Sequence, residues 1–274
     1  MERWRGRVAV VTGASAGIGA AIAYQLQDAG VNVVALARRK EKIQSAVEEA
    51  RQEARKRGRA SLGKAPSPGE LHTLKCDVSN EEDIVAAFKW VKDNLKTVHI
   101  LVNNAGIGGR TKLDETNTAE WKGIFNTNVM GLSIGTREAV QLMKATGVED
   151  GHIIHIGSWA GHNLLNFPGI SMYSASKHAV RVLTEGLRKE LVAAKSKIRV
   201  TEVSPGVVRT DFSKDRPPSK EVLASLGISK AVDLYTVLPH LQSEDVADAV
   251  LYAIATPPHV QIHQILLKPV GENF

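Results

Sequence analysis

Short apolar runs alternate with longer amphipathic stretches through most of the sequence, and this alternation constrains the fold more than any other feature. Short apolar runs bounded by turn residues indicate buried strands, whereas stretches with helical periodicity indicate helices that cover a sheet. The expected strands are 8–11, 31–36, 71–75, 100–102, 152–156, 199–203 and 261–268. The expected helices are 18–28, 40–57, 81–94, 118–146, 173–195 and 243–255. This order predicts an α/β fold, a doubly wound parallel sheet of about seven strands with helices on both faces.

Two segments depart from the alternation. Residues 58–69 are rich in lysine, proline and glycine, which predicts a long connection in front of the third strand. Residues 210–241 hold prolines around a short helix-like run, so we expect a substrate lid at about 207–241. The sequence contains no internal repeat and no second domain boundary, which predicts a single domain over residues 1–274.

A formal net charge of +6 at pH 7 raises the question of nucleic-acid binding. Six basic residues and one acid gather in segment 51–64, and no aromatic side chain stands among them to stack on a base. We interpret the segment as a solvated surface and expect no nucleic-acid partner. A nucleic-acid patch is the alternative.

The chain has a single cysteine, Cys76, so no internal disulfide can form and a reducing compartment is expected. Cys76 falls in a strand-like run, which indicates a small core residue rather than a catalytic thiol. No apolar stretch approaches the ~20 residues that a membrane-spanning helix needs. We therefore expect a cytoplasmic protein without a transmembrane segment.

A glycine-rich turn follows the first expected strand and reads Thr12-Gly13-Ala14-Ser15-Ala16-Gly17-Ile18-Gly19. Such glycines permit a tight turn and let a pyrophosphate approach the backbone at a helix N-terminus. The first two glycines are three residues apart, where the common dinucleotide fingerprint has one, so a turn without a ligand is the alternative. Together with the sheet, the turn predicts a Rossmann-type dinucleotide-binding domain.

The end of the second expected strand bears on the choice of cofactor. An acid at this place hydrogen-bonds the ribose 2′-hydroxyl of NAD, whereas an arginine accommodates the 2′-phosphate of NADP. The chain has no acid here and instead places Arg38 and Arg39 after Ala37. The sequence therefore favours NADP, and the alternative is that the two arginines only begin a solvated helix.

Tyr173 and Lys177 stand four residues apart, which puts them on one face of the expected helix. An ammonium near a phenol favours the phenolate and lowers the tyrosine pKa, which suits a general acid and base. The pair alone is a weak motif. Ser158 and Asn104 follow other expected strands and Asn128 lies in the long fourth helix, so these groups converge where parallel strands end.

These motifs, together with Asp77-Val78 and Pro205-Gly206-Val207-Val208-Arg209-Thr210, resemble the short-chain dehydrogenase/reductase family in order and over nearly the whole length. The resemblance implies a catalytic set, which is Asn128, Ser158, Tyr173 and Lys177. It also implies a set of residues that hold the cofactor, namely Gly13, Ser15, Gly17, Ile18, Gly19, Arg38, Arg39, Asp77, Val78, Asn104, Ala105, Gly106, Tyr173, Lys177, Pro205, Gly206, Val208 and Thr210.

The family resemblance also implies a role for each catalytic residue. Tyr173 exchanges a proton with the substrate oxygen, and Ser158 hydrogen-bonds that oxygen. Lys177 lowers the pKa of Tyr173 and holds the nicotinamide ribose, while Asn128 supports Lys177 through a water molecule. Ser158 and Tyr173 are about two residues further apart than is common in the family, so the substrate entrance is expected to differ in shape.

Within the family, the chain resembles the branch of insect farnesol dehydrogenases and vertebrate dehydrogenase/reductase SDR family member 11. The resemblance rests on the opening Met1-Glu2-Arg3-Trp4, on segments 150–154, 158–162 and 183–188, and on the ending 256–262. It favours farnesol or a related isoprenoid alcohol as substrate. A ketosteroid or a dicarbonyl compound is the alternative.

Apolar residues between Ser158 and Tyr173 and in the expected lid suit a hydrophobic alcohol or carbonyl compound. The expected substrate-binding residues are Ser158, Trp159, Leu165, Phe167, Tyr173 and Phe212. Some of the apolar side chains can instead form the core of the lid. Three nearby histidines, His155, His162 and His178, lack the spacing of metal ligands, so no metal is expected.

A non-enzymatic NADP-binding regulatory protein is the alternative from another functional class. Such a protein would keep the glycine-rich turn and the arginines and lose Tyr173 or Lys177, but this chain has both. The family resemblance further suggests a homodimer or homotetramer built on the helices 118–146 and 173–195.

Overall fold

The computed structural model of the chain describes residues 1–58, 65–109, 112–115, 117–164, 167–213, 223, 234–236 and 238–272. Within these residues lies one seven-stranded parallel sheet in the order β3-β2-β1-β4-β5-β6-β7. The strands are β1 (Val8–Thr12), β2 (Asn32–Ala37), β3 (Leu71–Lys75), β4 (Ile100–Asn103), β5 (His152–Ile156), β6 (Arg199–Pro205) and β7 (Gln264–Leu267). The expected doubly wound α/β fold is confirmed, and only β7 is clearly shorter than the expected strand 261–268.

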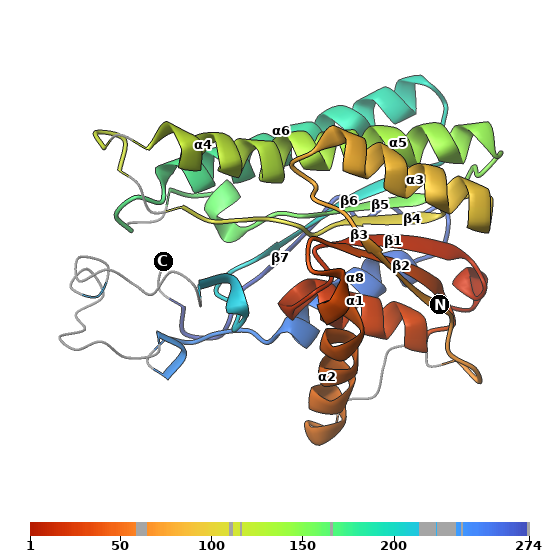
Figure 1. The fold of residues 1–274 in the computed structure, drawn as a ribbon, viewed down its shortest axis with the longest axis horizontal. Helices are drawn as coiled ribbons and strands as arrows, with labels where there is room; N and C mark the ends of the chain where they lie inside the picture. The colour runs from red at the N-terminus through yellow and green to blue at the C-terminus, as the bar shows by residue number, and fades with distance from the viewer. Residues whose placement is uncertain are drawn as a thin grey trace.

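Two layers of helices cover the sheet (Figure 1). One layer contains α3 (Glu81–Leu95), α4 (Thr118–Phe125), α5 (Leu132–Ala145) and α6 (Ser171–Ala193). The other contains α1 (Gly17–Asp28), α2 (Ile43–Lys56) and α8 (Ser243–Ala255). Short 3-10 turns lie at Glu2–Trp4, Lys40–Lys42, Trp159–Gly161, Asp211–Ser213 and Leu234–Thr236.

The central strands are buried on both faces, as a parallel sheet between two helical layers requires. Every residue of β1, β4, β5 and β6 is buried. Because successive strand residues point to opposite faces, Val10 and Val11 of β1 belong to different cores. Val11 lies in the cluster that includes Leu251 of α8, and Val10 in the cluster that includes Phe88 of α3. Each such buried side chain contributes about 1.5–3 kcal/mol.

The expected single helix over 118–146 is wrong in one respect. The structure has α4, then a π-helical segment at Asn126–Gly131, then α5. A π-bulge adds a residue to a helical turn and often lies at a functional site. Here it carries Asn128, one of the expected catalytic residues.

The connections of the sheet place the candidate site. From β1 the chain passes to β2 and β3 on one side, then returns to β4 and continues on the other side. The direction of winding therefore reverses between β1 and β4, and in open α/β sheets ligands bind in the crevice outside the carboxyl ends of strands at this point. Gly13 and Asn104 directly follow β1 and β4.

The expected lid at 207–241 lies mostly outside the described residues. Its two described ends run side by side, because Val208 forms a parallel β-bridge with Leu241. The basic run 51–64 is described only to residue 58, and there Arg51 pairs with Glu48 at 2.6 Å. No helix in the described part of the chain is long and apolar enough to cross a membrane.

Candidate active site

The glycine-rich turn leaves the N-terminus of α1 open to a ligand. Gly13 and Gly17 have positive φ angles of 69° and 53°, which disfavour side chains. A Cβ atom at Gly19 would lie 2.4 Å from the carbonyl oxygen of Gly13 and 2.5 Å from Nδ2 of Asn104. The first turn of α1 has no acid, and none of the described side chains caps it. Its amides can therefore receive an anionic phosphate group.

Thr12 joins the loops after β1 and β4. Its hydroxyl oxygen accepts hydrogen bonds from the amides of Asn104 and Ala105, both at 3.0 Å. The side-chain amide of Asn104 donates to the carbonyl oxygen of Thr12 at 2.9 Å. These bonds place Asn104, Ala105 and Gly106 beside the glycine-rich turn, as expected. Thr12 opens the glycine-rich motif but was not among the expected site residues.

Arg38 and Arg39 are exposed just past the end of β2. Arg38 lies near enough to Asp77 to act on its carboxylate. Burial opposes ionisation of Asp77, but hydrogen bonds from Ser79 and the charge of Arg38 hold its pKa below the ordinary value. The carbonyl oxygen of Val78 lies against Gly131, because a Cβ atom added at Gly131 would be 2.3 Å from that oxygen. The residues expected to hold the adenosine end of a dinucleotide thus follow β2 and β3, which are neighbours in the sheet.

Segment 205–210 begins at the last residue of β6 and approaches the same turn. A Cβ atom at Gly17 would lie 3.1 Å from Cγ2 of Thr210, so these two expected cofactor residues are in contact range. The hydroxyl of Tyr235 donates to the carbonyl oxygen of Thr210 at 3.2 Å. Gly206 instead packs on Glu272, whose Oε2 would lie 2.4 Å from an added Cβ atom. Glu272 also accepts from the amide of Val207 at 3.0 Å.

Ser158 and Tyr173 meet beyond the end of β5. Ser158 begins the 3-10 turn Trp159–Gly161, where its Oγ accepts from the amide of Ala160 at 3.1 Å. Its hydroxyl also lies near enough to the phenol of Tyr173, in the first turn of α6, to lower the pKa of that phenol. Burial raises the pKa of Tyr173, and the Ser158 hydroxyl partly opposes this rise. Tyr173 therefore holds its proton at neutral pH.

Lys177 is buried one helical turn after Tyr173. Its Nζ donates to the carbonyl oxygen of Ile156 at 2.8 Å and lies 5.9 Å from the centre of the Tyr173 ring. Burial lowers the pKa of Lys177 to about 8, although the carboxylate of Glu202 acts to raise it. The expected lowering of the Tyr173 pKa by Lys177 is not seen, because burial of the phenol raises that pKa.

Asn128 binds the loop after β4 rather than Lys177 itself. Its Oδ1 accepts from the amide of Ile107 at 2.8 Å, and its Nδ2 donates to the carbonyl oxygen of Ile107 at 2.9 Å. The same Nδ2 donates to the hydroxyl of Ser176 at 3.0 Å. At Gly106 a Cβ atom would lie 3.4 Å from Oδ1 of Asn128 and 3.7 Å from Nζ of Lys177. Asn128 thus fixes the loop that passes between it and Lys177.

The expected substrate-binding residues have different surroundings. The ring of Phe212 lies 5.8 Å from that of Tyr173 and is half exposed, so it can border a substrate. Trp159 instead stacks on His162 at 6.1 Å, and Lys268 lies over its indole at 4.4 Å. Phe167 is partly buried, whereas Leu165 lies outside the described residues.

The three histidines near the site have structural partners. His155 is buried between the hydroxyls of Thr136 and Thr184, at 3.1 and 2.8 Å. His178 contacts the carbonyl oxygen of Ser174 at 2.9 Å. The residues described contain no cluster of three or more side chains that could hold a metal ion. Cys76 is buried, and burial raises the pKa of its thiol to about 12, which suits an inert core residue.

The sequence profile of the short chain dehydrogenases matches residues 7–221. The chain belongs to the short-chain dehydrogenase family. It is therefore an oxidoreductase, and its Rossmann-type sheet is the fold of that family.

Two relatives and one solved structure resemble the chain over nearly its whole length. It is 46% identical to farnesol dehydrogenase of Aedes aegypti, covering all of both chains. It is 44% identical to dehydrogenase/reductase SDR family member 11 of Homo sapiens, over 99% of this chain and 97% of the relative. The closed form of serine dehydrogenase complexed with NADP+ is 30% identical, with a TM-score of 0.78, and the alignment covers 97% of this chain and 96% of that one. The resemblance to the farnesol dehydrogenase and family member 11 branch is confirmed.

Proposed function

We propose that this short-chain dehydrogenase is NADP-dependent and transfers a hydride between nicotinamide and a hydrophobic alcohol or carbonyl compound, with farnesol or a related isoprenoid alcohol as substrate. The meeting of Ser158, Tyr173 and Lys177 beside the open N-terminus of α1 carries the proposal. This arrangement puts a proton donor, a hydrogen-bonding hydroxyl and a buried ammonium at the end of the sheet where a dinucleotide would lie.

The choice of NADP rests on the end of β2. Arg38 and Arg39 are exposed there, and the charge of Arg38 acts on Asp77 of the neighbouring loop. A guanidinium suits the 2′-phosphate because it can donate two parallel hydrogen bonds to phosphate oxygens. The similar serine dehydrogenase is complexed with NADP+, which supports the same cofactor for this chain.

The protein's own residues supply the proton in this reaction, and the nicotinamide cofactor supplies or accepts the hydride when bound. Because the pKa of Tyr173 is raised, its phenol is protonated at neutral pH and can donate to a carbonyl oxygen that becomes an alcohol. The hydroxyl of Ser158, which lies near that phenol, orients the same substrate oxygen. In the reverse direction Tyr173 must first lose its proton, and the nearby ammonium of Lys177 favours that loss.

The proposal of a hydrophobic substrate rests on the side chains beside Tyr173. Phe212 lies against Tyr173 and leaves half of its surface free, so apolar burial can supply much of the affinity. The relative from Aedes aegypti is a farnesol dehydrogenase, which supports an isoprenoid alcohol. A panel of farnesol, geraniol, retinol and ketosteroids tests the substrate and cofactor assignments together. Turnover is measured by nicotinamide absorbance, with NADP and with NAD. Farnesol should give the highest kcat/KM, and a ketosteroid in first place would reject the isoprenoid assignment.

The variant Tyr173→Phe tests the catalytic assignment. Loss of a positioned general acid typically costs at least about 100-fold in rate, so turnover should fall by that factor or more while NADPH still binds. Tyr252→Phe is the matched control, because Tyr252 is 58% exposed on α8. Near-normal turnover by Tyr173→Phe would mean that another group exchanges the proton.

Replacing Arg38 tests the cofactor assignment. Arg38→Ser should weaken NADP binding by roughly 10- to 100-fold, because a charged hydrogen bond is worth about 1.5–3 kcal/mol. Binding of NAD should change little. Lys42→Ser removes another exposed cation nearby and serves as the control. Equal losses for both cofactors in Arg38→Ser would show that another residue recognises the 2′-phosphate.

We also propose that the protein forms a homodimer or homotetramer through the layer of α4, α5 and α6. Met130, Val182 and Val192 in this layer are 52%, 71% and 60% exposed. Exposed apolar side chains on neighbouring helices are typical of subunit interfaces. Light scattering after gel filtration should give a mass of two or four chains, and a single-chain mass would reject this proposal.

A further inference from the structure

A carboxylate buried near the candidate active site takes no part in the mechanism above. Glu202 lies in the middle of β6 and is only 2% exposed. It pairs in register with His155 of β5, whose side chain bonds to Thr184 of α6. Residues paired across neighbouring strands share a face of the sheet, so Glu202 lies on the face that α6 covers. That is also the face from which Lys177 reaches the sheet.

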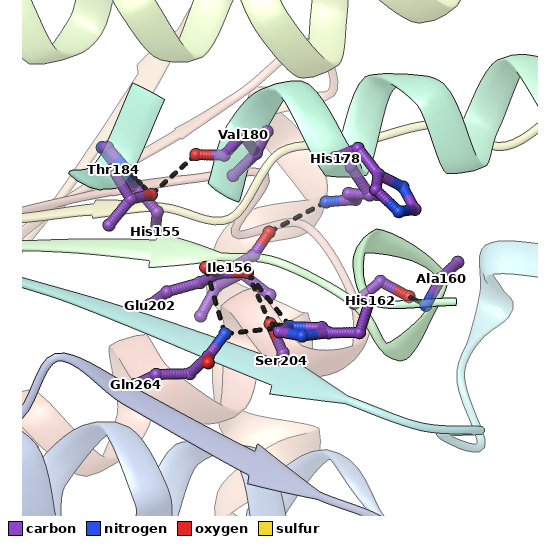
Figure 2. A network of polar contacts seen from close by, with 12 residues as sticks. His155, Ile156, Ala160, His162, His178, Val180, Thr184, Glu202, Ser204 and Gln264 are labelled. Atoms are coloured by element: carbon purple, nitrogen blue, oxygen red, sulfur yellow. Dashed lines mark hydrogen bonds and ion pairs between the residues drawn. The ribbon is translucent and has the colours of Figure 1, made fainter. Parts of the chain in front are cut away.

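Neutral hydrogen-bond donors surround this carboxylate, as Figure 2 shows. The hydroxyl of Ser204 donates to Oε1 at 2.6 Å, and the side-chain amide of Gln264 donates to Oε2 at 3.3 Å. The Gln264 amide also donates to Nε2 of His162 at 2.9 Å, which assigns His162 as neutral with its proton on Nδ1. Donors of this kind favour the ionised carboxylate without neutralising its charge.

The carboxylate and the ammonium of Lys177 both contact the short backbone stretch of Ile156 and Gly157. Nζ of Lys177 donates to the carbonyl oxygen of Ile156 at 2.8 Å. Oε1 of Glu202 lies against Gly157, where a Cβ atom would be 2.2 Å away. Because any side chain at position 157 would displace the carboxylate, glycine there lets it lie against the residue that follows Ile156, whose carbonyl oxygen binds Lys177.

Lys177 needs such a partner because it is itself only 5% exposed. A buried ammonium tends to lose its proton unless an opposite charge lies nearby. Within the described residues, neither a lysine nor an arginine forms an ion pair with Glu202 at 4.0 Å or less, and only His162 approaches it, at 3.8 Å. The charged groups that act on Glu202 are Lys177 and Arg181, both from α6, and His178 and Arg181 act on His162.

We infer that Glu202 is a positioning residue for the proposed reaction: its buried carboxylate is the counter-charge that keeps Lys177 in the ammonium form, and the hydrogen bonds from Ser204 and Gln264 favour the ionised form of that carboxylate. The inference rests on the proposed function, in which Lys177 acts as an ammonium on the nicotinamide ribose and on Tyr173. The electrostatics agree with the geometry. Burial lowers the pKa of Lys177 to about 8, and Glu202 raises it. Burial also raises the pKa of Glu202, and the hydrogen bonds from Ser204 and Gln264 oppose that rise, together with the positive charges of α6.

The variant Glu202→Gln removes the charge and keeps the size of the side chain. In the unaltered enzyme, kcat/KM should fall as Lys177 loses its proton above about pH 8. In Glu202→Gln this fall should begin about one pH unit lower, because a neighbouring opposite charge typically shifts a pKa by one unit or more. Glu202→Asp keeps the charge and should restore the original profile. Glu185→Gln, on the exposed side of α6, is the matched control and should leave the profile unchanged.

A second readout separates this inference from the proposed function. Titration of NADPH fluorescence between pH 6 and pH 10 needs no substrate and reports how Lys177 holds the ribose. Binding should weaken about one pH unit lower in Glu202→Gln than in the unaltered protein. A shifted binding profile without turnover of any substrate in the panel would support the inference and reject the proposed substrate.

Identical pH profiles for the unaltered protein and Glu202→Gln, in turnover and in NADPH binding, would overturn the inference. So would equal loss in Glu202→Gln and Glu202→Asp, because a purely structural role depends on shape rather than charge. If Glu202→Gln does not fold, as judged by circular dichroism, Ser204→Ala decides the question. That variant removes the 2.6 Å hydrogen bond to the carboxylate and should shift the profile in the same direction by a smaller amount. An unchanged profile in Ser204→Ala would then reject the inference.

Discussion

The side chain of Asn128 should be a main support of the active-site loop. It is 1% exposed and makes three hydrogen bonds, two to the backbone of Ile107 and one to Ser176. A buried hydrogen bond contributes about 1 kcal/mol, and an amide or carbonyl left without a partner costs about 1–3 kcal/mol. Asn128→Ala strips Ile107 of both partners, so the free energy of unfolding should fall by about 3 kcal/mol.

Urea denaturation followed by circular dichroism measures this change, and two further variants test its cause. Asn126→Ala alters an exposed asparagine in the same π-helical segment and should change stability by less than about 0.5 kcal/mol. Asn128→Asp should cost at least as much as Asn128→Ala, because a carboxylate would face the carbonyl oxygen of Ile107 without a proton to donate. If Asn128→Ala were no less stable than Asn126→Ala, the three hydrogen bonds of Asn128 would not contribute the predicted free energy of unfolding.

Two more predictions concern the glycine-rich turn and acid stability. Gly19→Ala should weaken NADPH binding by more than about tenfold, because the new methyl group would collide with the backbone of Gly13 and move the turn. A Cβ atom added at Gly186 in α6 would have no neighbour within 4 Å, so Gly186→Ala should not affect NADPH binding. If fluorescence titration showed equal losses of NADPH affinity in Gly19→Ala and Gly186→Ala, the steric argument would be disproved. Burial lowers the pKa of His99 to about 4 and that of His155 to about 3, while both titrate near 6.5 when unfolded. The unfolded state therefore binds more protons below pH 6.5, and this pair should make the protein about 3 kcal/mol less stable at pH 5 than at pH 6.5. Equal urea midpoints at the two pH values would contradict this.

Much of the fold was predictable because its signals are local. A short apolar run between turn residues identifies a buried strand wherever it occurs, and strands found this way formed the sheet. The glycine-rich turn and the four-residue spacing of Tyr173 and Lys177 are also local patterns. Because parallel strands all end at one edge, the order of these motifs was enough to predict that they converge.

Other features depend on contacts between segments that are distant in the sequence. The π-helical segment within 118–146 carries Asn128, which hydrogen-bonds to Ile107, 21 positions away. No helical periodicity indicates such a contact. The pKa of Tyr173 rises rather than falls because burial, a property of the folded chain, outweighs the opposing effect of Ser158.

Glu202 shows most clearly the difference between features set by local sequence and features set by contacts between distant segments. The sequence by itself determined the strand that carries it and the helix that carries Lys177, because the periodicity of hydrophobic side chains is fixed by the geometry of each element. Only the tertiary structure brought its carboxylate against Gly157, beside the residue that binds the ammonium. The physical reason is that burial, charge and hydrogen bonding are set by all the groups around an atom, and most of those groups come from other parts of the chain.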